Sequence, residues 1–92
     1  MKKIDLNFDL QDLNGNPVQG NPNAGQFVAG LLMSQTKGEA IKFFDWAMSL
    51  NKKEPITVDD SDFSKIKSLI NDSEHATLLA KAQILRKLDS VK

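Results

Sequence analysis

The sequence of 92 residues contains no cysteine, which excludes disulfides, thiolate nucleophiles and cysteine-ligated metal sites. It contains a single histidine, His75, so any catalytic scheme that needs an imidazole must use that residue. No apolar run approaches the roughly 20 residues that a membrane-spanning helix needs. Neither sign of charge is in excess, because twelve basic side chains balance twelve acidic ones. This balance removes the electrostatic reason to expect a nucleic-acid partner.

The opening of the chain also lacks the features of a secretory signal. No apolar stretch of about 7–15 residues follows Lys2 and Lys3. We therefore expect a cytoplasmic protein. A chain of this length has room for one hydrophobic core but not for a second core or a deep cleft between domains. We expect a single domain spanning residues 1–92, and not a large enzyme.

The firmest pattern is the alternation of apolar and polar residues from Ile4 to Leu10, which predicts a strand with one buried face. Asn14-Gly15 favours a tight turn with two positive φ angles, and Pro17 limits the return strand to a short edge arm. The β-branched residues 56–58 predict a further short strand that pairs with the first. Together these segments predict a small two- or three-stranded antiparallel sheet.

Apolar residues at helical spacing predict four helices. The first covers about residues 24–35. The second covers about 37–50 and starts at a capping box formed by Thr36 and Glu39. The third is capped by Asp59 or Asp60, and the fourth begins behind Ser73 and ends near residue 89. The predicted fold is therefore an α+β domain in which four helices pack on the small sheet.

The most unusual feature is a span without charge, from Leu13 to Thr36. Within it, residues 24–33 carry one polar side chain, so this helix is either central to its own domain or shared with another chain. Small residues four positions apart let a second helix come close, which makes Gly25, Ala29 and Met33 the predicted contact strip.

Two interpretations of this strip remain open. In the first, it packs under the C-terminal helix. In the second, it forms a surface for a protein partner or for self-association. Three residues of the second helix, Ile41, Phe44 and Met48, extend this predicted partner-binding surface, although they could equally belong to the core.

The densest acidic cluster, Asp59, Asp60 and Asp62, invites a metal-binding hypothesis. It lacks the glycine and glutamate of a calcium loop, and aspartates are common in the first turn of a helix. His75 falls near the start of the fourth helix, where a solvated or capping role is typical. We expect no catalytic residue, no cofactor and no metal site. A small enzyme or metal protein centred on His75 or on these aspartates is the third hypothesis.

The fourth helix is basic. Lys81, Arg86 and Lys87 lie towards its carboxyl end, which suggests an alternative function as a small nucleic-acid-binding regulator. These residues are spaced around the helix, however, and no stacked aromatic side chains lie between them. Their spacing is typical of a solvated face, so nucleic acid is not the expected partner.

A resemblance adds to this interpretation. It rests on the segment KGEAIKFFDWA at 37–47, Leu50, the segment EPITV at 54–58, and Asp62. Over about residues 37–70 the chain resembles small uncharacterised proteins encoded among tailed-phage and prophage genes. The resemblance implies an accessory or assembly factor in the host cytoplasm or on the virion, and it assigns no binding residue. The leading hypothesis is a non-enzymatic protein that docks an apolar helical surface onto itself or onto a larger assembly.

Overall fold

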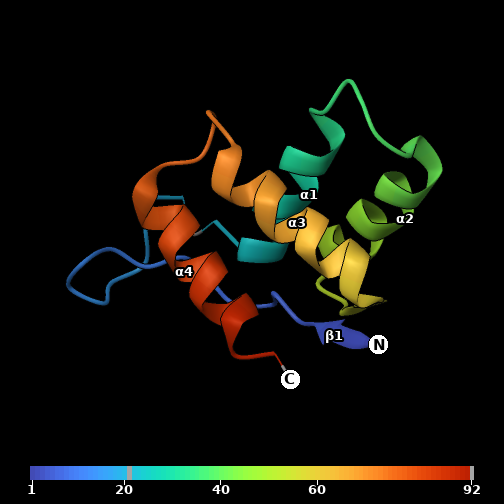
Figure 1. Ribbon diagram of the computed structural model, residues 1–92. Helices are drawn as coiled ribbons and strands as arrows, with labels where there is room; N and C mark the ends of the chain where they lie inside the picture. The colour runs from blue at the N-terminus through green and yellow to red at the C-terminus, as the bar shows by residue number, and fades with distance from the viewer. Residues whose placement is uncertain (21, 92) are drawn as a thin grey trace.

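The computed structural model describes residues 1–20 and 22–91 (Figure 1). In chain order the elements are β1 (Lys2–Ile4), α1 (Ala24–Met33), α2 (Ala40–Asn51), β2 (Ile56–Val58), α3 (Asp60–Asp72) and α4 (Leu78–Asp89). Within the described residues, four helices accompany one two-stranded antiparallel sheet, which confirms the predicted α+β class. The molecule measures 36 × 29 × 24 Å.

The sheet joins the start of the chain to its middle. Lys2 lies opposite Val58, and Ile4 lies opposite Ile56. Ile4, Ile56 and Val58 are buried, so one face of this short ladder contributes to the core. The predicted pairing between the first strand and residues 56–58 is confirmed.

The strand predicted from Ile4 to Leu10 is wrong in its bounds, because β1 covers Lys2–Ile4 and its ladder ends where the predicted strand begins. Leu6 and Leu10 are buried all the same, so the alternation correctly indicated which side chains turn inward. Beyond Ile4 the backbone bonds to the start of α1 instead of a second strand: the Gly25 amide donates to the Leu6 carbonyl at 2.9 Å. The free amides of the first helical turn thus take the place of a neighbouring strand.

The predicted hairpin is reduced to a single bridge between Gln11 and Pro17. Gly15 has a φ of 84°, but Asn14 does not have a positive φ, so the predicted turn type is wrong. The Asp12 carboxylate instead accepts a hydrogen bond from the Asn14 amide at 2.9 Å. The Asp12 carboxylate thus adds to the backbone hydrogen bonds that close this turn, among them the Gly15 amide to the Asp12 carbonyl at 3.1 Å.

Helix starts were predicted with mixed success. The α1 cap is Asn23, which accepts from the Gln26 amide at 3.1 Å, and the α3 cap is Asp59, one of the two predicted residues. The α2 capping box is wrong: Glu39 is the cap residue but makes no side-chain cap bond. Its carboxylate pairs with the Lys42 ammonium at 3.0 Å instead.

The start of α4 is also corrected. Its cap is Thr77, not Ser73, because α3 continues through Asp72 and Ser73 forms the end of that helix. His75 therefore lies between α3 and α4 and not in the first turn of α4. Within α4, Ala80, Ile84 and Leu88 are buried, whereas Leu78 is exposed.

The helices pair in sequence order, α1 with α2 and α3 with α4. In Figure 1, α3 and α4 lie in the foreground and α1 lies behind α3. A single cluster of buried side chains connects both pairs to the sheet. The largest of its fully buried side chains are Ile4, Leu6, Val28, Leu32, Leu50, Ile66, Ile70, Ile84 and Leu88.

Gly25 is the closest contact between α1 and the rest of the chain. A Cβ atom at this position would lie 3.0 Å from the Leu50 carbonyl oxygen and 3.3 Å from that of Leu6. The small residue does allow a close approach, as predicted, but the neighbour is α2 and not the C-terminal helix or a partner.

Gly25→Ala is expected to lower the free energy of unfolding by about 1–3 kcal/mol, because two backbone carbonyls must move to admit the methyl group. Gly30→Ala is the matched control, since an added Cβ there has nothing within 4 Å. The control is expected to gain about 0.5–1 kcal/mol from the better helix former. Urea unfolding of both variants measures the difference, and equal stability of the two would contradict the close contact.

Candidate functional site

Exposed apolar side chains gather on α1 and α2. The exposed fractions are 46% for Met33, 80% for Ile41, 52% for Phe44 and 42% for Met48. Each of these large side chains lies on the outer side of the α1–α2 pair, whereas Leu32, Trp46 and Leu50 of the same helices are buried. The pair therefore has an apolar face that the rest of the described chain does not cover.

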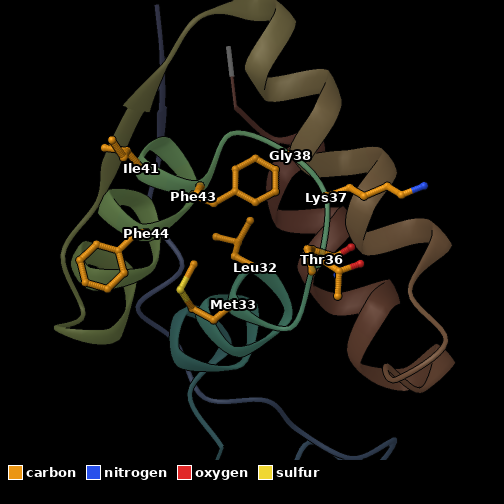
Figure 2. Close-up of a pocket in the computed structure, with 10 residues that line it drawn as sticks. Leu32, Met33, Thr36, Lys37, Gly38, Ile41, Phe43 and Phe44 are labelled. Atoms are coloured by element: carbon orange, nitrogen blue, oxygen red, sulfur yellow. The ribbon is translucent and has the colours of Figure 1, made fainter.

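Two hollows follow this face. The first, of about 440 Å³, lies between the end of α1, the connection 34–39 and the start of α2 (Figure 2). The second, of about 330 Å³, continues along both helices towards Asn51. Met33 and Phe44 line both hollows, so the two form one continuous surface feature. We call it the α1–α2 groove.

The inner wall of the first hollow includes Gly38 and the Phe43 ring. Gly38 has a φ of 123°, and a Cβ there would lie 3.0 Å from the Phe43 ring, so only glycine lets the connection cross this ring. The Phe43 ring in turn stacks on Trp46 with 5.6 Å between ring centroids. Figure 2 shows Phe43 beneath Gly38, with Leu32 on the facing side.

Small residues form the floor of the second hollow. Ala29 and Ala47 line it and are 6% and 4% exposed, so only their methyl groups reach the surface. Gly30 adds no side chain, and nothing stands within 4 Å of where its Cβ would be. The taller side chains of Met33, Phe44 and Met48 surround this floor, which leaves space for a large apolar side chain of another molecule.

The structure brings together five of the six residues predicted to bind a partner. Ala29, Met33, Ile41, Phe44 and Met48 all line the α1–α2 groove, and their role in binding stays a prediction. Gly25 is the exception, because it lines neither hollow and packs against the backbone of Leu6 and Leu50.

Sequence reasoning missed several residues that shape the groove, namely Gly30, Leu32, Gly38, Phe43 and Ala47. The charge-free span already contained Gly30 and Leu32, but nothing in it indicated which side of the helix would face outward. The placement of Gly38 beside Phe43 depends on the path of the connection, which has no periodic pattern to follow.

The groove is nearly free of charge. Among the residues that line it, Lys37 alone is ionic, and Figure 2 shows its side chain directed away from the hollow. The other polar groups along the edge are amides and hydroxyls, including Gln26, Gln35 and Asn51. The lining of the groove is therefore mainly apolar and uncharged.

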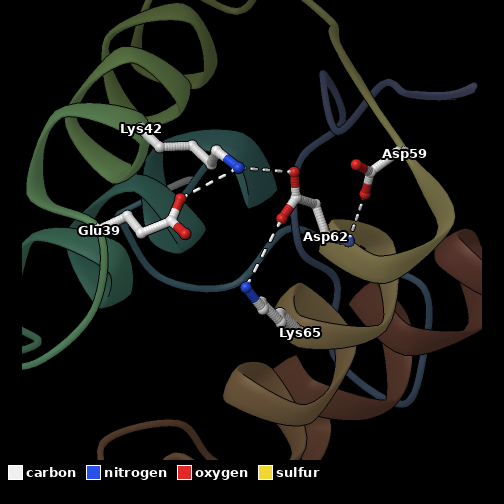
Figure 3. Close-up of polar contacts among 5 residues, drawn as sticks. All are labelled: Glu39, Lys42, Asp59, Asp62 and Lys65. Atoms are coloured by element: carbon white, nitrogen blue, oxygen red, sulfur yellow. Dashed lines mark hydrogen bonds and ion pairs between the residues drawn. The ribbon is translucent and has the colours of Figure 1, made fainter.

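A cluster of ions holds the start of α2 in place (Figure 3). The Lys42 ammonium lies 3.0 Å from the Glu39 carboxylate and 3.1 Å from that of Asp62. The Lys65 ammonium lies 3.9 Å from the second oxygen of the buried Asp62. Because Asp62 belongs to α3, Lys42 ties the first turn of α2, with its groove residues Ile41 and Phe43, to the other helix pair.

The cluster shifts the pKa of two of its members. The hydrogen bond from Lys42, followed by its charge, lowers the pKa of Glu39 from its ordinary value of 4.5. The hydrogen bonds to Glu39 and then to Asp62 raise the pKa of Lys42 above 10.5. Both shifts favour the charged forms, so Glu39 and Lys42 are paired as ions at neutral pH.

Glu39→Gln is expected to be less stable than the wild type at neutral pH, and this difference should disappear in acid. A lowered folded-state pKa stabilises the protein above the unfolded value and loses that contribution as the pH falls through the folded value. Urea midpoints from pH 7 down to about pH 3 measure the trend. Glu54→Gln is the control, because Glu54 is exposed and forms none of the described ion pairs. A difference that persists at low pH would show that Glu39 acts through packing.

The acidic residues considered for metal binding have other roles. Asp59 caps α3 by accepting from the Asp62 amide at 2.7 Å, and Asp62 pairs with Lys42. Across residues 1–20 and 22–91, no three histidine, cysteine or acidic side chains are grouped so as to hold a metal ion. His75 lines a polar hollow of about 440 Å³ together with Asp72 and Glu74.

The basic side chains of α4 do not form a surface of one sign. Arg86 and Lys87 line a shallow hollow of about 640 Å³ together with Asp9 and Phe8. At the end of the helix, the Asp89 carboxylate lies 2.6 Å from the Lys67 ammonium. The acidic side chains of Asp9 and Asp89 therefore lie close to basic side chains of this surface. This arrangement does not favour the alternative function of nucleic-acid binding through α4.

Comparisons with models of known protein families, with curated proteins and with solved structures found no match. None of the helices in the described part of the chain has both the length and the apolar character needed to cross a membrane.

Proposed function

We propose that this protein is a non-enzymatic accessory or assembly factor of tailed-phage or prophage origin, which docks a protein partner in the α1–α2 groove. It acts in the host cytoplasm or as part of the virion. The observation that carries the proposal is the uncovered apolar face around Met33, Ile41, Phe44 and Met48. The phage origin is supported by the resemblance of residues 37–70.

The size of this face supports a binding role. Met33, Ile41, Phe44 and Met48 are 46%, 80%, 52% and 42% exposed, which together equals about two fully exposed side chains. At roughly 150–250 Å² for each large side chain, the uncovered apolar area is roughly 400 Å². The largest apolar patch on a monomer is about 300–600 Å² and is often functional. The chain has a well-filled core elsewhere, so these side chains are not exposed for lack of other apolar residues.

Charge distribution favours a protein partner over nucleic acid. The groove has a single lysine among its lining residues, whereas binding to a phosphate backbone draws on many cationic contacts. On α4, Asp9 stands beside Arg86 and Lys87 in one hollow. These observations support the groove as the binding surface in preference to α4.

Site-specific crosslinking in the native cell tests the proposal. A photoreactive phenylalanine analogue at position 44 is expected to yield a discrete crosslinked product with a protein. The same analogue at position 13 is the control, because Leu13 is 94% exposed and lies outside the groove. If position 44 gives no product, or if both positions give the same products, the groove is not a docking surface.

A further inference from the structure

We propose that the partner in the α1–α2 groove is a second copy of this chain, and that the two copies meet as a symmetric dimer with their α2 helices antiparallel. In such a dimer each copy presents the same face and receives it from the other. This inference rests on the proposed function and names its protein partner.

The apolar area of the face is close to what one side of a dimer needs. A standard interface buries about 800 Å² on each partner, and about 56–65% of that area is apolar. The required apolar contribution is therefore roughly 450–520 Å² from each copy. The four exposed side chains of the groove leave roughly 400 Å² uncovered, and the methyl groups on the floor of the second hollow add to it. One symmetric contact would thus cover the whole face.

The face also has the two shapes that a self-complementary contact requires. Phe44 projects from it and is 52% exposed. The low floor of the second hollow is formed by Ala29, Gly30 and Ala47. Because both shapes lie on one copy, a twofold axis lets Phe44 of each copy enter the second hollow of the other. The same contact then forms twice.

The lining of the face carries no charge that opposes a second copy. Near a twofold axis a group lies close to its own counterpart, so an ionic side chain there would meet a like charge and weaken the contact. Among the described residues that line the two hollows, Lys37 is the one ionic side chain. It is directed away from the first hollow in Figure 2. Two identical faces can therefore approach each other without like-charge repulsion.

The edge of the face carries one acid and one base. Asp45 lies three residues before Met48 and Lys52 lies four residues after it, so both flank Met48 on the helix surface. Both are exposed, and neither takes part in the ion pairs found within residues 1–20 and 22–91. They are thus two helical turns apart, or about 10 Å along α2, and are available to groups on another molecule.

A twofold axis beside Met48 satisfies the charges and the shapes together. In an antiparallel α2 pair with its axis there, Asp45 of each copy comes opposite Lys52 of the other, and two equivalent ion pairs form at the edge. In the same register Phe44 of each copy reaches the Asn51 end of the other copy's second hollow. The register that pairs the charges is therefore also the one that fills the hollow.

Sedimentation equilibrium of the purified protein tests the dimer. We expect a reversible increase to twice the mass of one chain, with a Kd of about 10 µM or tighter. Met48→Glu should raise this Kd by about 30-fold or more, because two carboxylates then meet at the axis. Met48→Gln separates lost apolar contact from added charge and should raise the Kd less. Leu78→Glu is the control, because Leu78 is 82% exposed on α4 and lies outside the groove.

Exchanging the charges at the edge tests the twofold register. Asp45→Lys and Lys52→Asp should each weaken association of the variant with itself by about tenfold, because each sets like charges opposite one another at both ends of the contact. An equimolar mixture of the two variants should associate as tightly as the wild type, since every lysine then faces an aspartate. The double variant should recover for the same reason. Circular dichroism melting confirms that each variant is folded.

Three results would overturn the inference. The first is a wild-type protein that remains a monomer up to about 1 mM. The second is a dimer that Met48→Glu leaves intact. The third is a mixture of the two charge variants that associates no better than either variant alone. A monomer that still crosslinks from position 44 to a different protein would leave the proposed function intact, whereas the absence of any crosslink from position 44 would remove both.

Discussion

Trp46→Ala is expected to remove about 3–5 kcal/mol from the free energy of unfolding, the usual cost of truncating a large buried aromatic residue. The indole is 8% exposed. It stacks on Phe43 at 5.6 Å between centroids, and the Lys42 ammonium lies 5.9 Å from its ring. Truncation therefore removes core contacts and also the support beneath the inner wall of the groove. Since small domains are stable by only about 5–15 kcal/mol, this variant should lose a large part of its stability.

Denaturation in urea, followed by circular dichroism, measures this loss. Leu13→Ala serves as the control, because Leu13 is 94% exposed and its truncation should change stability by no more than about 0.5 kcal/mol. A Trp46→Ala variant within about 1 kcal/mol of the wild type would contradict the buried position of the indole.

Phe44→Glu is expected to weaken binding of the protein partner proposed for the α1–α2 groove by about 30-fold or more, equivalent to about 2 kcal/mol of binding free energy. Phe44 contributes to both hollows, so a carboxylate at this position disturbs both of them together. The side chain is 52% exposed in the free protein. Stability should consequently change far less than binding, by about 0.5–1 kcal/mol.

The neighbouring residue sharpens this prediction. Phe43→Leu should lose stability, because that ring packs on Trp46 and under Gly38, whereas Phe44→Leu should retain stability and part of the binding. Anisotropy titrations and urea unfolding on the same samples separate the two effects. Unchanged affinity of Phe44→Glu for the protein partner captured by crosslinking, with the fold intact, would show that the α1–α2 groove is not the interface.

Several parts of the fold were predictable because they depend on local pattern. Alternation identified Ile4, Leu6 and Leu10 as inward-facing, and a free carboxylate before an apolar helical repeat identified Asp59 as a cap. These features need only the chemistry of residues close in sequence. The pairing of residues 56–58 with the start of the chain was predicted from their β-branched side chains, although the partner is Lys2–Ile4 and only Ile4 of it belonged to the predicted strand.

Other features could not be predicted because a distant group competes with the local one. The Glu39 carboxylate had an available cap position, but Lys42 holds it in a network with Asp62, which lies far along the chain. The strand expected beyond Ile4 stops because the amides of α1 take its carbonyls. In both cases the hydrogen-bond or ion-pair partner that forms belongs to another helix, and the sequence pattern does not predict where that helix lies.

The candidate site, too, could be predicted from the sequence only in part. The sequence alone established a charge-free and strongly apolar first helix, a second helix with two apolar flanks, and more apolar helical surface than a chain of this length readily buries. Only the tertiary structure decided which flank stays outside. Gly25 of α1 packs against Leu50 of α2, while Met33, Ile41, Phe44 and Met48 remain uncovered. The reason is that the rotation of one packed helix relative to another depends on all the contacts between them. The hydrophobic periodicity of either helix does not determine it.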